Sequence, residues 1–161
     1  MPEYDLSFAR KLAETAALLA AQRLTTLEAR RTALYLSLLA TEIGIKAMLE
    51  QAGEPVANIR KRSHNLGALT RELGKCKVKI ELAPGVQKSV SAAKIRAIEV
   101  GDDSGKVTVG KILDAEAQGA SIYPNQIRYG PLLRHYPAEV VVRMAGEVVA
   151  FAEKHWSTIH K

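Results

Sequence analysis

Hydrophobic residues recur at intervals of three and four along three long stretches of the chain, which is the spacing of one helix face. The first stretch runs from Asp5 to Arg23, and either Asp5 or Ser7 can cap it. We expect four residues on its apolar face, namely Phe8, Leu12, Ala16 and Leu19. The pattern therefore predicts an amphipathic helix at the start of the chain.

The second stretch, from Thr25 to Gln51, carries the strongest helical pattern. Thr25 and Glu28 have the spacing of a capping box, and Gly53 and Pro55 end the run. Its apolar stripe consists of Leu27, Leu34, Leu38, Ile45 and Leu49, widened by Leu36, Leu39, Ile43, Ala47 and Met48. A stripe this wide indicates burial on several sides, so we expect this helix at the centre of a bundle.

The third stretch is the closing helix, which we expect from about Pro137 to about His155. Its apolar positions are Val141, Met144, Val148 and Phe151. We expect the three long helices to form one antiparallel core. Its central residues would be Leu34, Leu38, Ile45, Val141, Met144 and Val148.

Shorter elements are expected in the middle of the chain. After a loop at residues 53–61, Ser63 can cap a short helix that carries Leu66, Leu69 and Leu73 and ends at Gly74. Residues 76–82 alternate as a half-buried strand whose outer face holds Lys77, Lys79 and Glu81, before a break at residues 83–85.

The pattern from residue 91 to residue 118 allows two interpretations. Residues 97–100 and 106–109 can be two strands joined by a turn, or residues 91–99 can form a short helix. Residues 109–118 then favour a further helical segment. The expected fold is mainly α: one domain, residues 1–161, forming an up-down bundle of four to five helices with an irregular, partly β insert around residues 76–110.

Composition adds limits on the class of protein. The chain has 161 residues, of which 47% are hydrophobic and 25% charged, as in a soluble globular domain. Its single cysteine, Cys76, can form neither an internal disulfide nor a thiolate metal cluster. We also find no apolar run of about eighteen residues and no secretion-signal pattern at the start. These features predict a cytoplasmic protein.

The net charge of +6 is concentrated in one segment. From Glu54 to Arg96 there are ten Lys or Arg residues against three Asp or Glu residues, and the rest of the chain is nearly neutral. This surplus suits a phosphate-bearing partner such as RNA, although surplus lysines also serve solubility. The candidate binding residues are Arg60, Lys61, Arg62, Lys77 and Lys79.

Two clusters of residues could carry chemistry. His64 follows Arg60-Lys61-Arg62-Ser63 at a helix start, where the neighbouring cations favour a neutral ring that can accept or relay a proton; alternatively, it only hydrogen-bonds a neighbouring loop. The second cluster lies on the loop before the closing helix and contains Tyr123, Arg128, Tyr129 and His135, which could instead simply pack that loop. Phosphate-loop, dinucleotide and metal motifs are absent from the sequence, so we expect no metal and no cofactor.

Three pieces of the sequence together resemble a known family. They are the run LSLLATEIGIKAMLEQAG at residues 36–53, then Ser63-His64-Asn65-Leu66 opening a leucine-bearing helix, and then Ile127-Arg128-Tyr129 before a closing amphipathic helix. In this order they are similar to a HEPN domain, a helical family named for nucleotide binding in prokaryotes and higher eukaryotes. The strand-like segment at residues 76–110 departs from that family's pattern of four or five helices and would be an insert.

The resemblance implies a helical bundle, often a homodimer, that binds nucleotides or RNA or acts as a metal-independent ribonuclease in a toxin–antitoxin or defence system. Active members carry an Arg and, after it, a His, with four to six residues between them. Arg128 and His135 enclose six residues and meet this spacing, whereas Arg60 and His64 enclose three and do not. Tyr129 stands where the family commonly has a polar residue, and Gly130-Pro131 interrupts the helix. The alternative is a non-catalytic, dimerising module that binds a partner protein such as a nucleotidyltransferase.

Overall fold

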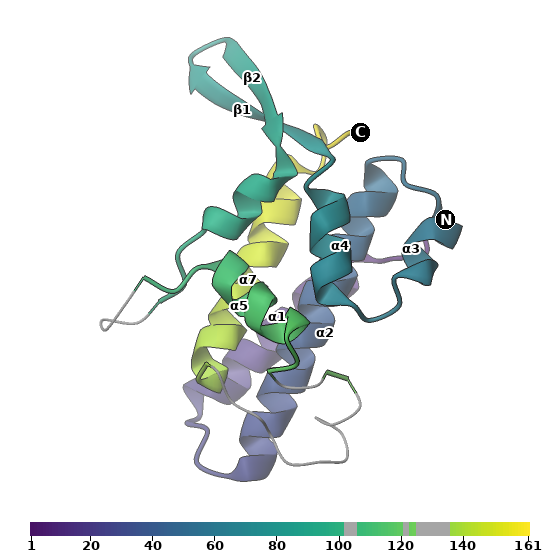
Figure 1. The fold of residues 1–161 in the computed structure, drawn as a ribbon. Coiled ribbons are helices and arrows are strands. Elements are labelled where there is room, and N and C mark those ends of the chain that lie inside the picture. The colour runs from purple at the N-terminus through teal and green to yellow at the C-terminus, as the bar shows by residue number, and fades with distance from the viewer. Residues whose placement is uncertain (102–105, 121–122, 125–135) are drawn as a thin grey trace.

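Three long helices lie side by side in the computed structural model, which describes residues 1–101, 106–120, 123–124 and 136–161 (Figure 1). They are α1 (Leu6–Ala21), α2 (Leu27–Gln51) and α7 (Ala138–His155), and each contacts the other two. The expected mainly helical fold is confirmed. The start of α2 differs by one residue from the prediction, because Thr26 and not Thr25 accepts the capping hydrogen bond, from the backbone N–H of Ala29.

The directions of these helices correct the expected antiparallel core. α1 runs antiparallel to α7, since Ala9 packs with Val149 and Ala16 packs with Val142. α2 and α7 run in the same direction, because Ala33 near the start of α2 lies in the cluster of Val142, and Gly44 further along lies beside Val148. α7 can run parallel to α2 because the chain between these two helices is long enough to return to the end of the bundle where α2 begins.

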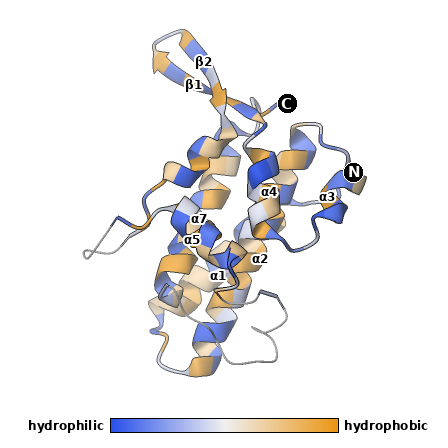
Figure 2. Cartoon of the chain, in the orientation of Figure 1, coloured by the Kyte–Doolittle hydropathy of each residue, from blue (hydrophilic) through white to orange (hydrophobic). Residues whose placement is uncertain are grey.

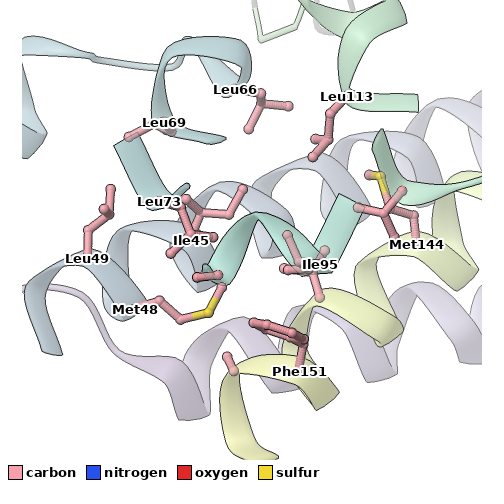
Figure 3. Close-up of a cluster of buried hydrophobic side chains, with 14 of the residues drawn as sticks. Ile45, Met48, Leu49, Leu66, Leu69, Leu73, Ile95, Leu113, Met144 and Phe151 are labelled. Atoms are coloured by element: carbon pink, nitrogen blue, oxygen red, sulfur yellow. The ribbon is translucent and has the colours of Figure 1, made fainter. Parts of the chain in front are cut away.

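The core is centred on α2, as expected. Its cluster includes all six residues predicted to be buried together, Leu34, Leu38, Ile45, Val141, Met144 and Val148. Ile45 and Met144 are labelled in Figure 3 among their buried neighbours. Leu27, by contrast, is 48% exposed, so the buried stripe begins one to two turns after the helix does. The helix is long and apolar enough to cross a membrane by those two criteria alone, and 72% of its most apolar window is buried inside the protein.

The buried face of α1 is made of alanines and not of its larger apolar residues. Ala9, Ala13 and Ala16 are buried, whereas Phe8 is half exposed and Leu12 is only partly covered. Small side chains on this face let the α1 backbone approach α2 and α7 closely, which larger residues would prevent. The predicted cap is confirmed: the Asp5 carboxylate accepts a hydrogen bond from the backbone N–H of Ser7 at 2.8 Å.

Two short helices follow α2. α3 (Val56–Lys61) occupies the segment that we expected to be a loop, and its Ile59 is fully buried. α4 (Leu66–Leu73) ends at Gly74 as predicted, but its cap is Asn65, whose side chain accepts from the backbone N–H of Ala68. Ser63 instead sits at φ 48° in the turn between the two helices.

A hairpin then projects from the helical body (Figure 1). β1 (Lys77–Ala83) pairs antiparallel with β2 (Val86–Ser91), with Val78 opposite Val90. β1 is the predicted strand, whereas β2 was not expected because only Val86 and Val90 supply apolar positions there. At the base of the hairpin, Lys77 exchanges two backbone hydrogen bonds with His160.

After the hairpin, the structure agrees with the prediction of a short helix within residues 91–99 rather than with the two alternative strands. η1 (Ala92–Ala97) is a short 3₁₀ helix, and the two alternative strands amount to a single bridge between Glu99 and Thr108. α5 (Val109–Ala117) confirms the predicted segment, and Thr108 caps it. Both elements complete the core through Ile95, Ile112 and Leu113.

Candidate functional site

A buried carboxylate lies in the middle of the apolar helix α2. Glu42 is 3% exposed, and one of its oxygens lies 2.7 Å from the ammonium group of Lys46, one turn later on the same helix. Lys46 is buried as well. Because an ionised group loses its hydration when it is buried, it needs charged or hydrogen-bonding partners in the fold.

His64 is the second partner of this carboxylate. Its Nδ1 lies 3.0 Å from both oxygens of Glu42, although the two residues are 22 positions apart in the chain. Since a carboxylate only accepts hydrogen bonds, this contact places the ring proton on Nδ1 and leaves Nε2 as the basic nitrogen. His64 lies in the turn between α3 and α4, which places its ring against Glu42 of α2, and about half of the His64 side chain is exposed.

Tyr123 completes the cluster from a third part of the chain. Its hydroxyl donates to Glu42 Oε2 at 2.6 Å. Its ring is perpendicular to the His64 ring at a centroid distance of 6.1 Å, and its centroid lies 6.0 Å from that of the Tyr35 ring. Side chains from α2, from the α3–α4 turn and from the segment after α5 therefore contact Glu42.

A cavity of about 360 Å³ opens beside this cluster. Its walls combine the turn before α4 with the end of α5 and with Tyr123, and the lining residues include Arg62, His64, Asn65 and Glu116. α4 and α5 lie close together here, since a Cβ on Gly67 would come within 2.8 Å of the Ala117 side chain. The exposed part of His64 thus faces a space large enough for a small ligand.

The N-terminal residues cover Lys46. The Tyr4 ring lies 5.3 Å from the Lys46 ammonium group, a cation–π distance. The carboxylate of Glu50 holds this segment in place by accepting from the backbone N–H groups of Glu3 and Tyr4. Glu42 and Lys46 are therefore enclosed near Tyr4, whereas His64 reaches the cavity.

The expected basic face is only partly available for a ligand. Arg60 is ion-paired with Glu3, and its Nε donates to a Glu3 oxygen at 2.8 Å. Arg62 lies 2.8 Å from Glu72, and the hydrogen bond from Lys75, followed by the charge of Arg62, lowers the pKa of Glu72. His64 itself contacts the Glu42 carboxylate, a partner that the basic residues before it in the sequence did not indicate.

Lys77 and Lys79 do share one face of the hairpin, as predicted from their spacing. They lie opposite Ser91 and Ser89, are exposed, and make no ion pair within the part of the chain that the structure describes. Lys61 is exposed too. Arg128, Tyr129 and His135 lie outside the described residues, so of the second predicted cluster Tyr123 alone is placed at the site.

Sequence reasoning missed the role of Glu42 and Lys46. A signal was present, because Glu42 falls one turn after Leu38 on the apolar stripe of α2, where a carboxylate needs a partner. Lys46 supplies one at the i, i+4 spacing. The contacts with His64 and Tyr123 had no such local signal.

Comparisons with known proteins return no match to any protein-family model, to any curated protein or to any solved structure. Within the described residues, no group of three or more His, Cys, Asp or Glu side chains is arranged to hold a metal ion.

Proposed function

We propose that this chain is a HEPN-like cytoplasmic protein that binds RNA or a nucleotide in the cavity beside His64 and cleaves RNA without a metal ion. The observation that carries the proposal is the hydrogen bond from His64 Nδ1 to the buried carboxylate of Glu42, next to that cavity. The assignment to the family, and with it a role in a toxin–antitoxin or defence system, rests on the resemblance of the sequence alone.

Metal-independent cleavage of RNA needs a base for the 2′-hydroxyl proton, a cation for the charged phosphorane and an acid for the leaving oxygen. In our proposal, His64 Nε2 takes the proton, and Glu42 holds the ring in the required tautomer and stabilises the imidazolium that forms. The arrangement supports proton transfer because Glu42 is itself positioned by Lys46 and Tyr123.

The charges in the cavity suggest how a nucleotide would lie. Arg62 is on one wall and Glu116 is on another. We place the phosphate toward Arg62, which would bind it in addition to its ion pair with Glu72, and the base toward the ring of Tyr123, which can stack on it. Arg128 and His135 remain candidates for the catalytic cation and for the acid through their family spacing. A twofold homodimer would bring two such sets together.

The experiment is cleavage of a labelled single-stranded RNA in EDTA by the wild-type protein, His64→Gln and the control His160→Gln. The control changes a histidine that is not among the lining residues of the cavity and whose ring bonds the backbone oxygen of the nearby Thr158. We expect the wild type and the control to cleave and His64→Gln to be slower by about 10²- to 10⁴-fold, the usual contribution of a general base. Equal rates for His64→Gln and the wild type would remove His64 from the mechanism, and an inactive wild type that also binds no RNA would refute the proposal.

The second candidate is a non-catalytic, dimerising module for a partner protein such as a nucleotidyltransferase. The hairpin tip favours it, because Leu82 and Val86 are 61% and 52% exposed on an element that projects from the body (Figure 2). Exposed apolar side chains on a projecting element are typical of contact surfaces. This module would bind its partner normally after His64→Gln and show no cleavage in EDTA.

A further inference from the structure

A second hollow, remote in sequence from the His64 cluster, lies between η1 and α7. It has a volume of about 350 Å³ and shares no lining residue with the cavity beside His64. η1 contributes Lys94 and Ala97 to its walls, and α7 contributes Glu147, Ala150, Phe151 and Lys154. We refer to it as the η1–α7 groove.

The charged side chains of the groove form no ion pair with any residue that the structure describes. In the described part of the chain, Lys94, Lys154 and Glu147 take part in no ion pair, whereas Arg96 of η1 pairs with Asp114 and Arg10 of α1 pairs with Glu14 and Glu153. η1 begins beside the C-terminal end of α7, since the backbone N–H of Ala92 donates to the backbone oxygen of Cys76, next to the pair that Lys77 forms with His160. The chain then runs toward the start of α7, where Arg143 donates to the backbone oxygen of Val100. The two lysines therefore sit at the same end of the groove.

The opposite charge is at the far end. Glu147 and Lys154 are seven residues apart on α7, which is two helical turns on one face, or about 10 Å along the axis. Between them, the floor is apolar: Ala97 and Ala150 are exposed, and Phe151 extends from α7 toward η1 (Figure 3). The groove thus has a cationic end, an apolar middle and an anionic end.

We propose that the η1–α7 groove binds a small linear zwitterion, with its carboxylate at Lys94 and Lys154, its apolar body over Ala97, Ala150 and Phe151, and its ammonium group at Glu147. A small molecule is favoured over a macromolecule because a volume of about 350 Å³ lies at the lower end of the range for small-ligand sites. This inference is independent of the proposed function, since it uses none of the residues around His64.

The test is isothermal titration calorimetry with 8-aminooctanoate, whose terminal groups are about as far apart as the two ends of the groove. Octanoate lacks the ammonium group, octylamine lacks the carboxylate, and 4-aminobutanoate is too short to span. We expect 8-aminooctanoate to bind tightest, because it alone satisfies both ends and the apolar middle. Equal affinity for all four compounds, or no binding of 8-aminooctanoate at millimolar concentration, would overturn the proposal.

Substitutions of the groove residues test whether 8-aminooctanoate binds in the η1–α7 groove. Lys94→Gln with Lys154→Gln should raise the Kd of 8-aminooctanoate and octanoate about three- to tenfold, since each exposed charge pair contributes a factor of a few. Glu147→Gln should weaken 8-aminooctanoate but leave octanoate unchanged. Ala150→Leu, which suits a helix and fills the apolar middle, should weaken both. The exposed Lys61 serves as a matched control, because Lys61→Gln removes a charge outside the groove.

Circular dichroism and the melting temperature of each variant would confirm that it is folded. If Lys61→Gln reduced binding as much as the groove variants did, the attraction would be a general effect of net charge and the groove assignment would be wrong. A Glu147→Gln variant that bound octanoate and 8-aminooctanoate with unchanged affinities would rule out recognition of the ammonium group.

Discussion

Nδ1 of His64 lies 3.0 Å from each carboxylate oxygen of Glu42, so a half-exposed ring in a turn is held by a fully buried acid on the central helix. The same acid accepts from Tyr123 and pairs with Lys46. Glu42 is consequently both the electrostatic partner of the candidate base and a residue on which the stability of the core depends.

Removing only one member of the buried pair should therefore be costly. We expect Glu42→Ala to lower the free energy of unfolding by about 3–5 kcal/mol, because Lys46 would stay buried without its counter-ion. The double variant Glu42→Leu with Lys46→Met should recover much of that loss, since no uncompensated charge remains. Urea unfolding measures both. Glu14→Ala on the exposed face of α1, where the ion pairs of Glu14 are solvated, should change stability by at most about 1 kcal/mol.

Two glycines should respond in opposite ways to the same substitution. Gly146 is exposed inside α7, and a Cβ at this position would meet only open space, so Gly146→Ala should raise stability by up to about 1 kcal/mol through helix propensity. Gly67→Ala should lower stability, because its Cβ would lie 2.8 Å from the Ala117 side chain and force α4 and α5 apart. Thermal unfolding of the two variants tests the close approach; an equal gain in both would contradict it.

Stability should fall as the pH drops below about 6.5 because of His155. Burial lowers the pKa of this ring from its ordinary value of 6.5, so the unfolded chain binds a proton before the folded protein does. The contribution is fully present above pH 6.5 and is lost as the pH falls through the folded pKa. His155→Leu should flatten the stability profile in this range, as measured by urea unfolding between pH 7.5 and about 5. A variant profile as steep as that of the wild type would show that another group is responsible.

A second loss of stability is expected at lower pH from Glu54. The hydrogen bond from Lys161 lowers the pKa of this carboxyl below its ordinary value of 4.5, and Arg62 lies 3.9 Å away. A depressed carboxyl pKa stabilises the fold above about pH 4.5, and this contribution disappears as the pH falls through the folded pKa. Glu54→Gln should therefore be less stable at pH 7 and less sensitive to acid, whereas the exposed Glu28→Gln should behave like the wild type.

If RNA binds to the hairpin, its affinity should depend on salt concentration through contacts of its phosphates with Lys77 and Lys79. Each phosphate neutralised contributes a slope of about −0.7 to −0.9 in log K against log salt concentration. Replacing both lysines by Gln should flatten the slope by about one to two units, measured by fluorescence anisotropy with a labelled RNA. The matched control is Arg10→Gln with Lys11→Gln on α1, which removes the same charge elsewhere on the surface. A slope changed equally by both double variants would assign the salt effect to net charge alone.

The local pattern of the sequence predicted most of the regular structure. The long helices, the helix ending at Gly74, the strand from Lys77 and the segment before Gly119 follow from apolar periodicity and from Asp5, Pro137 and the glycines at their ends. The burial of Leu38 and Met144 in one core follows as well. For α1, periodicity predicted the buried Ala16 but not Ala9 and Ala13, which lie on the face that approaches α2 and α7 closely.

What the sequence by itself determined is therefore the set of helices and their apolar faces, which depend on residues three and four positions apart. Only the tertiary structure decided that α7 runs parallel to α2, that Tyr123 reaches Glu42 across 81 positions, and that Lys94 and Lys154 line one groove. The physical reason is that a helix face is specified by local spacing, whereas the pairing of faces depends on the packing of the whole chain. Side chains from distant segments meet only once those faces are packed together.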